Sequence, residues 1–396
     1  MDANVADWLS MLFRWFHIIA GIAWIGTSFH FMSLDYGLRK RPGQPEGVKG
    51  DIWLVHGGGF YQMQKYTVAP DELPEHLHWY RWESYLTWIS GFGLLVIVYY
   101  WGANSFLIDR SVMPLLPSEA ILISLLSLGL GWLFYDRLCR SPLSHRPLVV
   151  FVILYAAIIL ASYVFAQVFS ARAAYLHVGM VIATMMTGNV FFVIIPNQRK
   201  VVADMIAGRP VDPEYGRIAK LRSTHNNYLT LPVVFMMISN HYPAVFGHPM
   251  AWVTVGFVLA IGGIVRHFFN TREAGGKGPD IMWQWPTAGA LAVIMLLFTA
   301  WRPDQQAVLE TVTTAEAVTI VNQHCLSCHA AAPTHPAFEE APGGVMFDDV
   351  ASIKANGDQI LAQSVLSNIM PLGNETEMTD EERARLGAWI RAGMPD

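Results

Sequence analysis

Runs of apolar residues long enough to cross a lipid bilayer recur through the first three quarters of this 396-residue chain. A membrane-spanning helix needs about 20 consecutive, mainly apolar residues. Because lipid offers no hydrogen bonds to an open backbone, such runs predict a bundle of helices. Eight are predicted, at residues 8–32, 84–101, 119–135, 147–169, 174–196, 228–247, 250–269 and 283–301.

The composition supports lipid as the main solvent of this part of the chain. Only 14% of the residues are charged and 53% are hydrophobic, whereas about 25% of an ordinary soluble domain is charged. With a net charge of −5 and three cysteines, the chain is not a disordered protein, a basic nucleic-acid binder or a secreted module held by disulfides.

Basic residues are concentrated in alternate loops between the predicted spans. Eighteen Lys and Arg residues lie in or beside the first, third, fifth and seventh loops, while the loops between them carry only Arg110 and Arg172. Cytoplasmic loops of membrane proteins carry an excess of Lys and Arg. The odd-numbered loops are therefore predicted to be cytoplasmic, with both chain termini on the outer side.

After residue 301 the sequence becomes polar and acidic. Residues 302–313 are predicted to be a linker, and residues 314–396 form a soluble module with 4 basic and 12 acidic side chains. The predicted fold is all-α: a polytopic membrane bundle over residues 1–301, followed by this small helical domain. An acidic module is suited to a partner with a basic surface.

The module contains Cys325, Cys328 and His329 in the pattern C-x-x-C-H, which is the attachment motif of c-type haem. At this spacing two thiols can form thioethers with the two haem vinyl groups, and the adjacent histidine becomes an iron ligand. A zinc site needs further ligands, and the remaining cysteine, Cys139, is assigned to a distant cytoplasmic loop as an inert thiol.

Methionine is a common sixth ligand of c-type haem iron, and the module offers Met346, Met370, Met378 and Met394. Met370 is the preferred candidate because Pro371 keeps it in a loop just before the last predicted helix. That helix is predicted to begin with a capping box made by Thr379 and Glu382. Met378 is the second candidate.

The module resembles a class I cytochrome c over essentially its whole length. Covalent haem is attached outside the bacterial cytoplasmic membrane, so this resemblance implies a periplasmic module. The loop charges independently predict the same side for the C-terminus. Together they predict a multi-pass protein of the bacterial inner membrane with both termini in the periplasm.

Histidines within a lipid-embedded bundle are costly and often functional. The bundle histidines fall into two groups by predicted depth. A pair of histidines on facing helices could ligate a non-covalent b-type haem, so one or two such haems are predicted. The alternative is that the histidines hydrogen-bond neighbouring helices or face lipid headgroups. His17, His177 and His241 are predicted toward the outer side, and His30, His225 and His267 toward the inner side.

The first cytoplasmic loop combines glycines with aromatic and basic residues. Residues 51–65 are predicted to be extended and contain three consecutive glycines, which allow close backbone approach to a ligand. Phe60, Tyr61, Lys65 and Arg81 could stack on and neutralise a planar anion. The alternative is an interfacial loop anchored in the membrane by its aromatic residues.

Five segments resemble the bacterial membrane-bound urate oxidases, also called urate hydroxylases. They are RWFHIIAGIAWIGTSF at 14–29, HGGGFY at 56–61, WE at 82–83, IPNQR at 195–199 and HNNYLTLP at 225–232. The resemblance covers nearly the whole chain and implies an eight-helix domain followed by a cytochrome c domain. It also implies conversion of urate to 5-hydroxyisourate in purine catabolism, with electrons passed through the c-type haem to a respiratory cytochrome or terminal oxidase.

The resemblance brings no settled set of catalytic residues, so these are hypotheses from chemistry and predicted depth. His56, Glu83 and His225 are candidates for the base that takes a proton from urate. Two other functions compete with urate oxidation. One is a quinol–cytochrome c oxidoreductase, and the other is a channel or transporter with a cytochrome c sensor domain.

Overall fold

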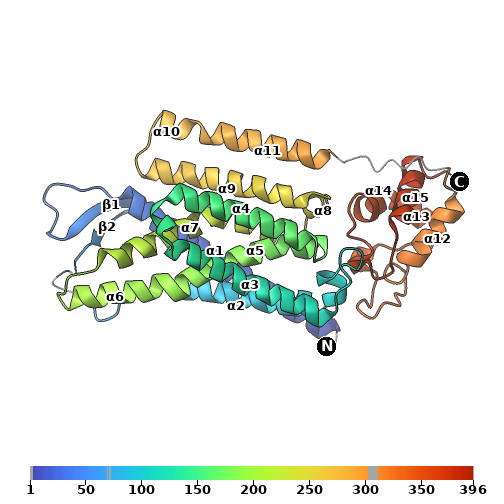
Figure 1. The fold of residues 1–396 in the computed structure, drawn as a ribbon, viewed down its shortest axis with the longest axis horizontal. Helices are drawn as coiled ribbons and strands as arrows, with labels where there is room; N and C mark the ends of the chain where they lie inside the picture. The colour runs from blue at the N-terminus through green and yellow to red at the C-terminus, as the bar shows by residue number, and fades with distance from the viewer. Residues whose placement is uncertain (1–2, 69, 71–72, 302–310, 396) are drawn as a thin grey trace.

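The computed structural model describes residues 3–68, 70, 73–301 and 311–395. It consists of an elongated helical bundle with a small helical module packed against one end (Figure 1). The bundle comprises α1 (Ala3–Gly37), α2 (Trp82–Leu94), η1 (Leu95–Tyr100), η2 (Ala103–Leu107), α3 (Pro117–Arg140), η3 (Pro142–His145), α4 (Pro147–Ala166), α5 (Ala171–Gly188), η4 (Asn189–Ile194), α6 (Ile195–Ile206), α7 (Pro213–Ser239), α8 (Pro243–Phe246), α9 (Ala251–Glu273), α10 (Pro279–Met282) and α11 (Gln284–Ala300).

Six helical stretches among the described residues are long and apolar enough to cross a membrane: Val5–Gly37, Pro117–Arg140, Pro147–Ala166, Ala171–Ile206, Ala251–Glu273 and Pro279–Ala300. The two other predicted runs are also helical but fall short of that standard. The run at 84–101 is divided between α2 and η1. The run at 228–247 begins within α7, whose first half is charged.

The fifth predicted span does not end at Pro196. The chain continues as helix from α5 through the π-helical η4 into α6, ending at Ile206. Proline is tolerated in the first turn of a helix, where its missing N–H is not needed. Pro196 occupies that position in α6, which explains why it does not end the helical rod.

The extended segment predicted in the first loop is a β-hairpin. Strand β1 (Val48–His56) pairs antiparallel with β2 (Gly59–Tyr66), and His56 lies opposite Gly59. Gly57 and Gly58 have φ of +58° and +75°, as a two-residue hairpin turn requires. The hairpin projects from the end of the bundle opposite the module (Figure 1).

The module contains α12 (Thr314–His324), η5 (Pro342–Gly344), α13 (Val350–Ala355), α14 (Gly357–Ile360), η6 (Leu361–Val365), η7 (Leu372–Asn374) and α15 (Asp380–Arg391). The core between α12 and α15 includes Val321, Leu386 and Trp389. The predicted capping box of Thr379 and Glu382 is confirmed at the start of α15. The predicted linker falls mostly on residues 302–310, which lie outside the described residues. Helix α1 begins at the same end of the bundle as the module (Figure 1).

Candidate functional site

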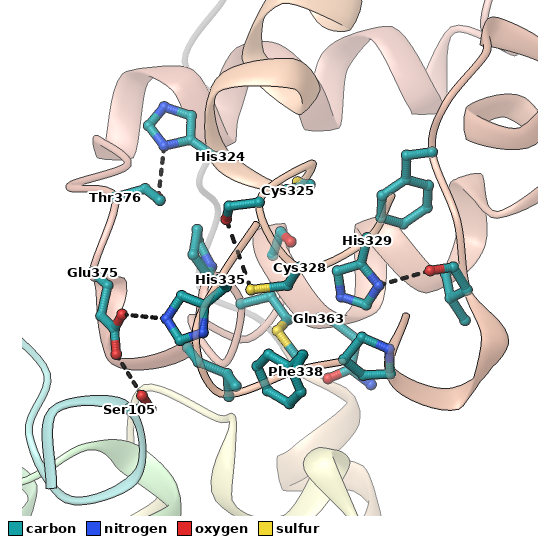
Figure 2. A pocket seen from close by; sticks show the side chains of 18 of the residues that line it. Ser105, His324, Cys325, Cys328, His329, His335, Phe338, Gln363, Glu375 and Thr376 are labelled. Atoms are coloured by element: carbon teal, nitrogen blue, oxygen red, sulfur yellow. Dashed lines mark hydrogen bonds and ion pairs between the residues drawn. The ribbon is translucent and has the colours of Figure 1, made fainter. Parts of the chain in front are cut away.

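A cavity of about 390 Å³ lies where the module meets the bundle. Its volume is within the range of small-molecule and cofactor sites. The three motif residues Cys325, Cys328 and His329 line it, and Figure 2 shows their side chains around one space. The bundle closes the other side with Ser105, Phe106 and Arg172. We call this space the interface cavity.

His329 is oriented as an iron-ligating histidine should be. Its Nδ1–H donates to the carbonyl oxygen of Val345 at 2.9 Å (Figure 2). A neutral ring protonated at Nδ1 keeps a lone pair on Nε2, and such backbone hydrogen bonds fix the tautomer of metal-bound histidines. His329 can therefore present Nε2 to a metal in the cavity.

Burial disfavours the thiolate form of both motif cysteines. Burial raises the pKa of Cys325 to about 12 and also raises that of Cys328. The structure brings no three His, Cys, Asp or Glu side chains of its described residues together as a metal site. This arrangement does not suit a structural zinc ion, which needs four ligands and thiolates.

Of the two methionine candidates, Met370 lines the interface cavity. Met378 is packed in the module core and is 3% exposed. The loop that carries Met370 is held by Arg383, which donates to the carbonyl oxygens of Met370 and Ser364, both at 2.6 Å. Of the two methionines, Met370 is therefore the one that could contact a group held in the cavity.

Several polar residues of the interface cavity were not identified from the sequence. The carboxylate of Glu375 accepts hydrogen bonds from His335 and from the Ser105 hydroxyl of the bundle (Figure 2). His324 is hydrogen-bonded to Thr376 at 2.9 Å and to Glu382 at 3.2 Å, so both its nitrogens are occupied. No local spacing pattern marks these contacts, so they could not be recognised from the residues alone.

The module is fastened to the bundle beside the cavity. The Arg110 N–H of the bundle donates to the carbonyl oxygen of Gly373 at 3.3 Å. Gly373 has φ of +57°, and a side chain there would overlap the carbonyl oxygen of Asn104. Glycine is thus needed for both the backbone conformation and the close approach.

A second group of polar residues is buried in the bundle between α3, η4 and α7. Asn189 donates to Tyr135 and Asn226, and its amide oxygen accepts from Arg222 at 3.1 Å. Arg222 is 1% exposed and forms an ion pair with Asp136 at 2.7 Å. We call this electrically balanced group the neutral cluster.

The predicted base His225 belongs to the neutral cluster. Its Nδ1 lies 2.9 Å from the hydroxyl of Tyr135. Since Tyr135 already accepts from Asn189, its own hydrogen is available to His225. Cys139, expected in a loop, is instead buried in the last turn of α3 beside His225.

A third group lies on another side of α7, against α9 and α1. Arg266, 8% exposed, donates to Asn227 at 3.4 Å and to Asn270 at 2.9 Å. Its guanidinium carbon lies 3.9 Å from the centre of the Phe29 ring. We call Arg266, Asn227, Asn270 and Phe29 the cation cluster.

The cation cluster is not electrically balanced by its described neighbours. No ion pair within the described residues joins Arg266 to a carboxylate, unlike Arg222 with Asp136. The buried side-chain nitrogen of Asn227 also has no hydrogen-bond partner there. A buried positive charge next to a free donor is costly without an anion, so this group suits an anionic ligand.

Arg222, assigned to a cytoplasmic loop from the sequence, lies instead within α7, whereas Arg266 lies within its helix as expected. Each is buried within a helix. An arginine within an apolar run is itself a signal of a functional site, so the sequence did contain a pointer to the cation cluster. Arg172, also assigned to a loop, lies in the first turn of α5.

The remaining candidate haem-ligating histidines of the bundle lie apart. His177 is buried with both nitrogens engaged, Nδ1–H donating to Ala173 and Nε2 accepting from Ser124, each at 2.7 Å. His17 is hydrogen-bonded to Thr87 and Ser90 of α2. His30 and His241 are exposed.

His267 is hydrogen-bonded to Tyr228 at 2.8 Å. In the part of the chain that the structure describes, no two of these histidines are joined by a hydrogen bond or ring contact. Paired ligation of b-type haem stays a prediction.

The candidates of the first loop are mostly exposed and not joined to one another. His56 lies beside the hairpin turn, and Phe60 and Tyr61 follow it, with Phe60 78% exposed. Lys65 forms an ion pair with Asp35 of α1. These positions fit an interfacial hairpin at least as well as a binding loop.

The two remaining candidates lie at the beginning of α2. Glu83 is in the first turn of α2, and Arg81 precedes that helix with its guanidinium over the ring of Trp82. No hydrogen bond or ion pair between described side chains connects Glu83 with His56 or His225. The described structure thus does not join the three predicted bases to one another, and their catalytic role stays a prediction.

A family model described as urate oxidase N-terminal matches residues 3–300. The chain belongs to this family. The match covers the bundle with both polar clusters and ends before the module. Searches of curated proteins and of solved structures gave no match. Membership supports an oxidoreductase related to urate oxidase, and the long apolar helices are consistent with a membrane protein.

Proposed function

We propose that this protein is a membrane-bound urate oxidase that converts urate to 5-hydroxyisourate and uses a c-type haem as the exit for the electrons. One observation carries the proposal. A bundle that belongs to the urate oxidase family forms one wall of a cavity whose other wall holds Cys325, Cys328, His329 and Met370. A substrate domain and an electron-accepting site are thus built into one chain.

The cation cluster is our proposed site for urate. Urate is a flat monoanion at neutral pH, with ring N–H groups and carbonyl oxygens. Arg266 supplies the uncompensated positive charge, the free nitrogen of Asn227 supplies a donor, and Phe29 supplies an aromatic surface. Charge-assisted hydrogen bonds of this kind are about twice as strong as neutral ones.

The reaction converts urate and one water molecule to 5-hydroxyisourate, two protons and two electrons. A group near the cation cluster must therefore accept a proton. Tyr228 and His267 are hydrogen-bonded to each other. Tyr228 follows Asn227 on α7, and His267 follows Arg266 on α9. We assign the proton-accepting role to this pair in preference to His56, Glu83 or His225.

The residues of the interface cavity fit a c-type haem. Two neutral thiols can add to the vinyl groups, His329 offers a free Nε2, and Met370 lines the same space. When bound, such a haem accepts and releases one electron at a time. Ser105 and Arg172 make the bundle part of the same cavity, so the electron-accepting site touches the domain that oxidises the substrate.

We place the protein in the bacterial inner membrane with the module in the periplasm. The excess of basic residues in alternate loops supports this orientation. Helix α1 begins at the end of the bundle that carries the module (Figure 1), which agrees with both termini lying on one side. The acidic module would then deliver electrons to a respiratory cytochrome or oxidase with a basic surface.

The test is anaerobic addition of urate to the purified full-length protein while its haem spectrum is recorded. Reduction of the c-type haem by urate, and not by xanthine, is the expected result. Reduction by a quinol but not by urate would establish the quinol–cytochrome c alternative instead. No reduction by either would favour a channel or transporter. The haem-to-protein ratio of the same sample tests the prediction of additional b-type haem.

A further inference from the structure

The interface cavity contains one Lys or Arg side chain among its described lining residues, and the bundle supplies it. Arg172 lies in the first turn of α5, after the capping residue Ser170. Its Nε atom is buried and has no hydrogen-bond partner in the described chain. Its guanidinium carbon lies 5.7 Å from the centre of the Phe246 ring. The cation thus borders the cavity without an anion.

The basic residues of the module do not supply a cation at the cavity. Arg383 is committed to the carbonyl oxygens of Ser364 and Met370 and to the Asn374 side chain. Arg385 forms an ion pair with Glu316. Lys354 and Arg391, the other two basic residues, are not among the residues that line the cavity.

A c-type haem brings two propionate groups, and these anions need positive partners when they are removed from water. The cavity's own carboxylate, Glu375, is already hydrogen-bonded to His335 and Ser105. A guanidinium with a buried, unpaired N–H is the donor that suits a carboxylate. Arg172 has that character and lies on the bundle side of the cavity.

We propose that Arg172 binds a propionate of the c-type haem, so that the membrane bundle supplies a ligand-binding residue to the haem of the module. This inference rests on the haem attachment that is part of the proposed function. Arg172 then holds the propionate edge of the haem against the bundle, the domain in which substrate is oxidised. It is a binding and positioning residue and takes no part in the oxidation of urate.

The experiment compares Arg172→Gln, Arg172→Lys and Arg110→Gln in the full-length holoprotein. Arg110 is the matched control, since it lies at the same interface, is exposed and does not line the cavity. The measurement is the haem midpoint potential from redox titrations between pH 5 and 8. Glu375, His335 and His324 also line the cavity, so each variant is compared with the wild type at the same pH.

Removing a positive charge beside the haem favours its oxidised form, so Arg172→Gln should lower the midpoint potential. It should also raise the propionate pKa and make the potential more dependent on pH across this range. Arg172→Lys should keep most of the wild-type potential, and Arg110→Gln should match the wild type. Equal shifts in Arg172→Gln and Arg110→Gln, or none in either, would overturn the assignment.

The same samples separate this inference from the proposed function. If the wild-type protein carries no covalent haem, both ideas fail. If it carries haem that urate reduces, but Arg172→Gln leaves the potential and its pH dependence unchanged, only the inference about Arg172 fails. If urate does not reduce the haem but the Arg172 variants shift its potential as expected, the inference stands and the proposed oxidation fails.

Discussion

The interface cavity and the cation cluster are built in different ways. In the cavity, the chemistry is concentrated in five consecutive residues from Cys325 to His329, with Met370 added from a loop. In the cation cluster, three helices contribute one or two residues each: Phe29 from α1, Asn227 from α7, and Arg266 and Asn270 from α9. A covalently held cofactor requires a fixed local spacing, whereas a buried site for a free ligand requires only that side chains meet in space.

The two buried arginines of the bundle show how charge distinguishes a structural group from a candidate binding site. Arg222 has Asp136 as its ionic partner and Asn189 as a further acceptor. Arg266 has the amide oxygens of Asn227 and Asn270 and the rings of Phe29 and Phe269 beside it, and no ion pair joins it to a carboxylate of the described residues. An uncompensated buried charge is costly, so we expect Arg266 to bind an anion and Arg222 to hold helices together.

The largest expected effect is loss of all covalent haem. Replacing both Cys325→Ala and Cys328→Ala removes the two sulfur atoms that thioether formation requires, so no haem should remain attached after denaturation. Haem staining of a denaturing gel measures this. Cys139→Ala, in α3 far from the motif in sequence, should retain full staining. Attached haem in the double variant would exclude the interface cavity as the attachment site.

The next largest effect separates the two methionine candidates. Met370→Ala removes the thioether that lines the cavity, and the haem should then lose its sulfur-to-iron charge-transfer absorption and fall in midpoint potential. Met378→Leu keeps the side-chain volume at a core position, so the absorption and the midpoint potential should both stay unchanged. Its stability cost should be below about 1.5 kcal/mol. Optical spectroscopy of both variants decides the matter, and the reverse pattern would make Met378 the ligand.

An intermediate effect is expected for substrate binding at the cation cluster. Arg266→Gln removes a charge-assisted interaction worth about 1.5–3 kcal/mol, which corresponds to a rise of about tenfold or more in the KM for urate. The matched control is Arg272→Gln, an exposed residue in the last turn of the same helix. The KM comes from urate-dependent reduction of the haem. An unchanged KM in Arg266→Gln with normal haem content would move the urate site elsewhere.

The parts of the molecule that the sequence predicted are those with a local physical cause. The extended segment at 51–65 was predicted from its residues, although its hairpin turn was not, and the spacing of Thr379 and Glu382 marks a helix start. Apolar runs identify where helices cross lipid, because the need to satisfy the backbone is a local one. These features were visible without knowing which helices are neighbours.

The parts that could not be predicted depend on tertiary neighbours. Pro196 does not interrupt its helix, because the π-helical segment before it places proline at the start of α6. Arg172 and Arg222 look like loop cations in the sequence, and only the packed helices show that Arg172 has a buried, unpaired Nε and that Arg222 is buried beside Asp136. The charge pattern that predicts topology therefore does not distinguish exposed loop cations from arginines packed within helices.

The smallest effect expected concerns an exposed charge of the module. Hydrogen bonds from the backbone N–H and the hydroxyl of Thr313, together with nearby Arg385, hold the pKa of Glu316 below its usual 4.5. A lowered folded-state pKa gives stability that is present above that usual value and is lost as the pH falls through the folded pKa. Glu316→Gln should lower the Tm of the module at pH 7 by no more than about 4 °C.

That difference in Tm should close as the pH falls below 4.5 and through the lowered pKa of Glu316, where the wild-type carboxylate itself becomes protonated. Thermal melts followed by circular dichroism in the haem region measure it in the full-length protein. Glu339→Gln is the control, because Glu339 is exposed and has no hydrogen bond or ion pair to another described residue. A constant difference across this pH range would show that Glu316 stabilises α12 by its shape in the capping box and not by its charge. Either result contrasts with Arg266, because water and salt screen the exposed charge of Glu316 but do not reach the buried charge of Arg266.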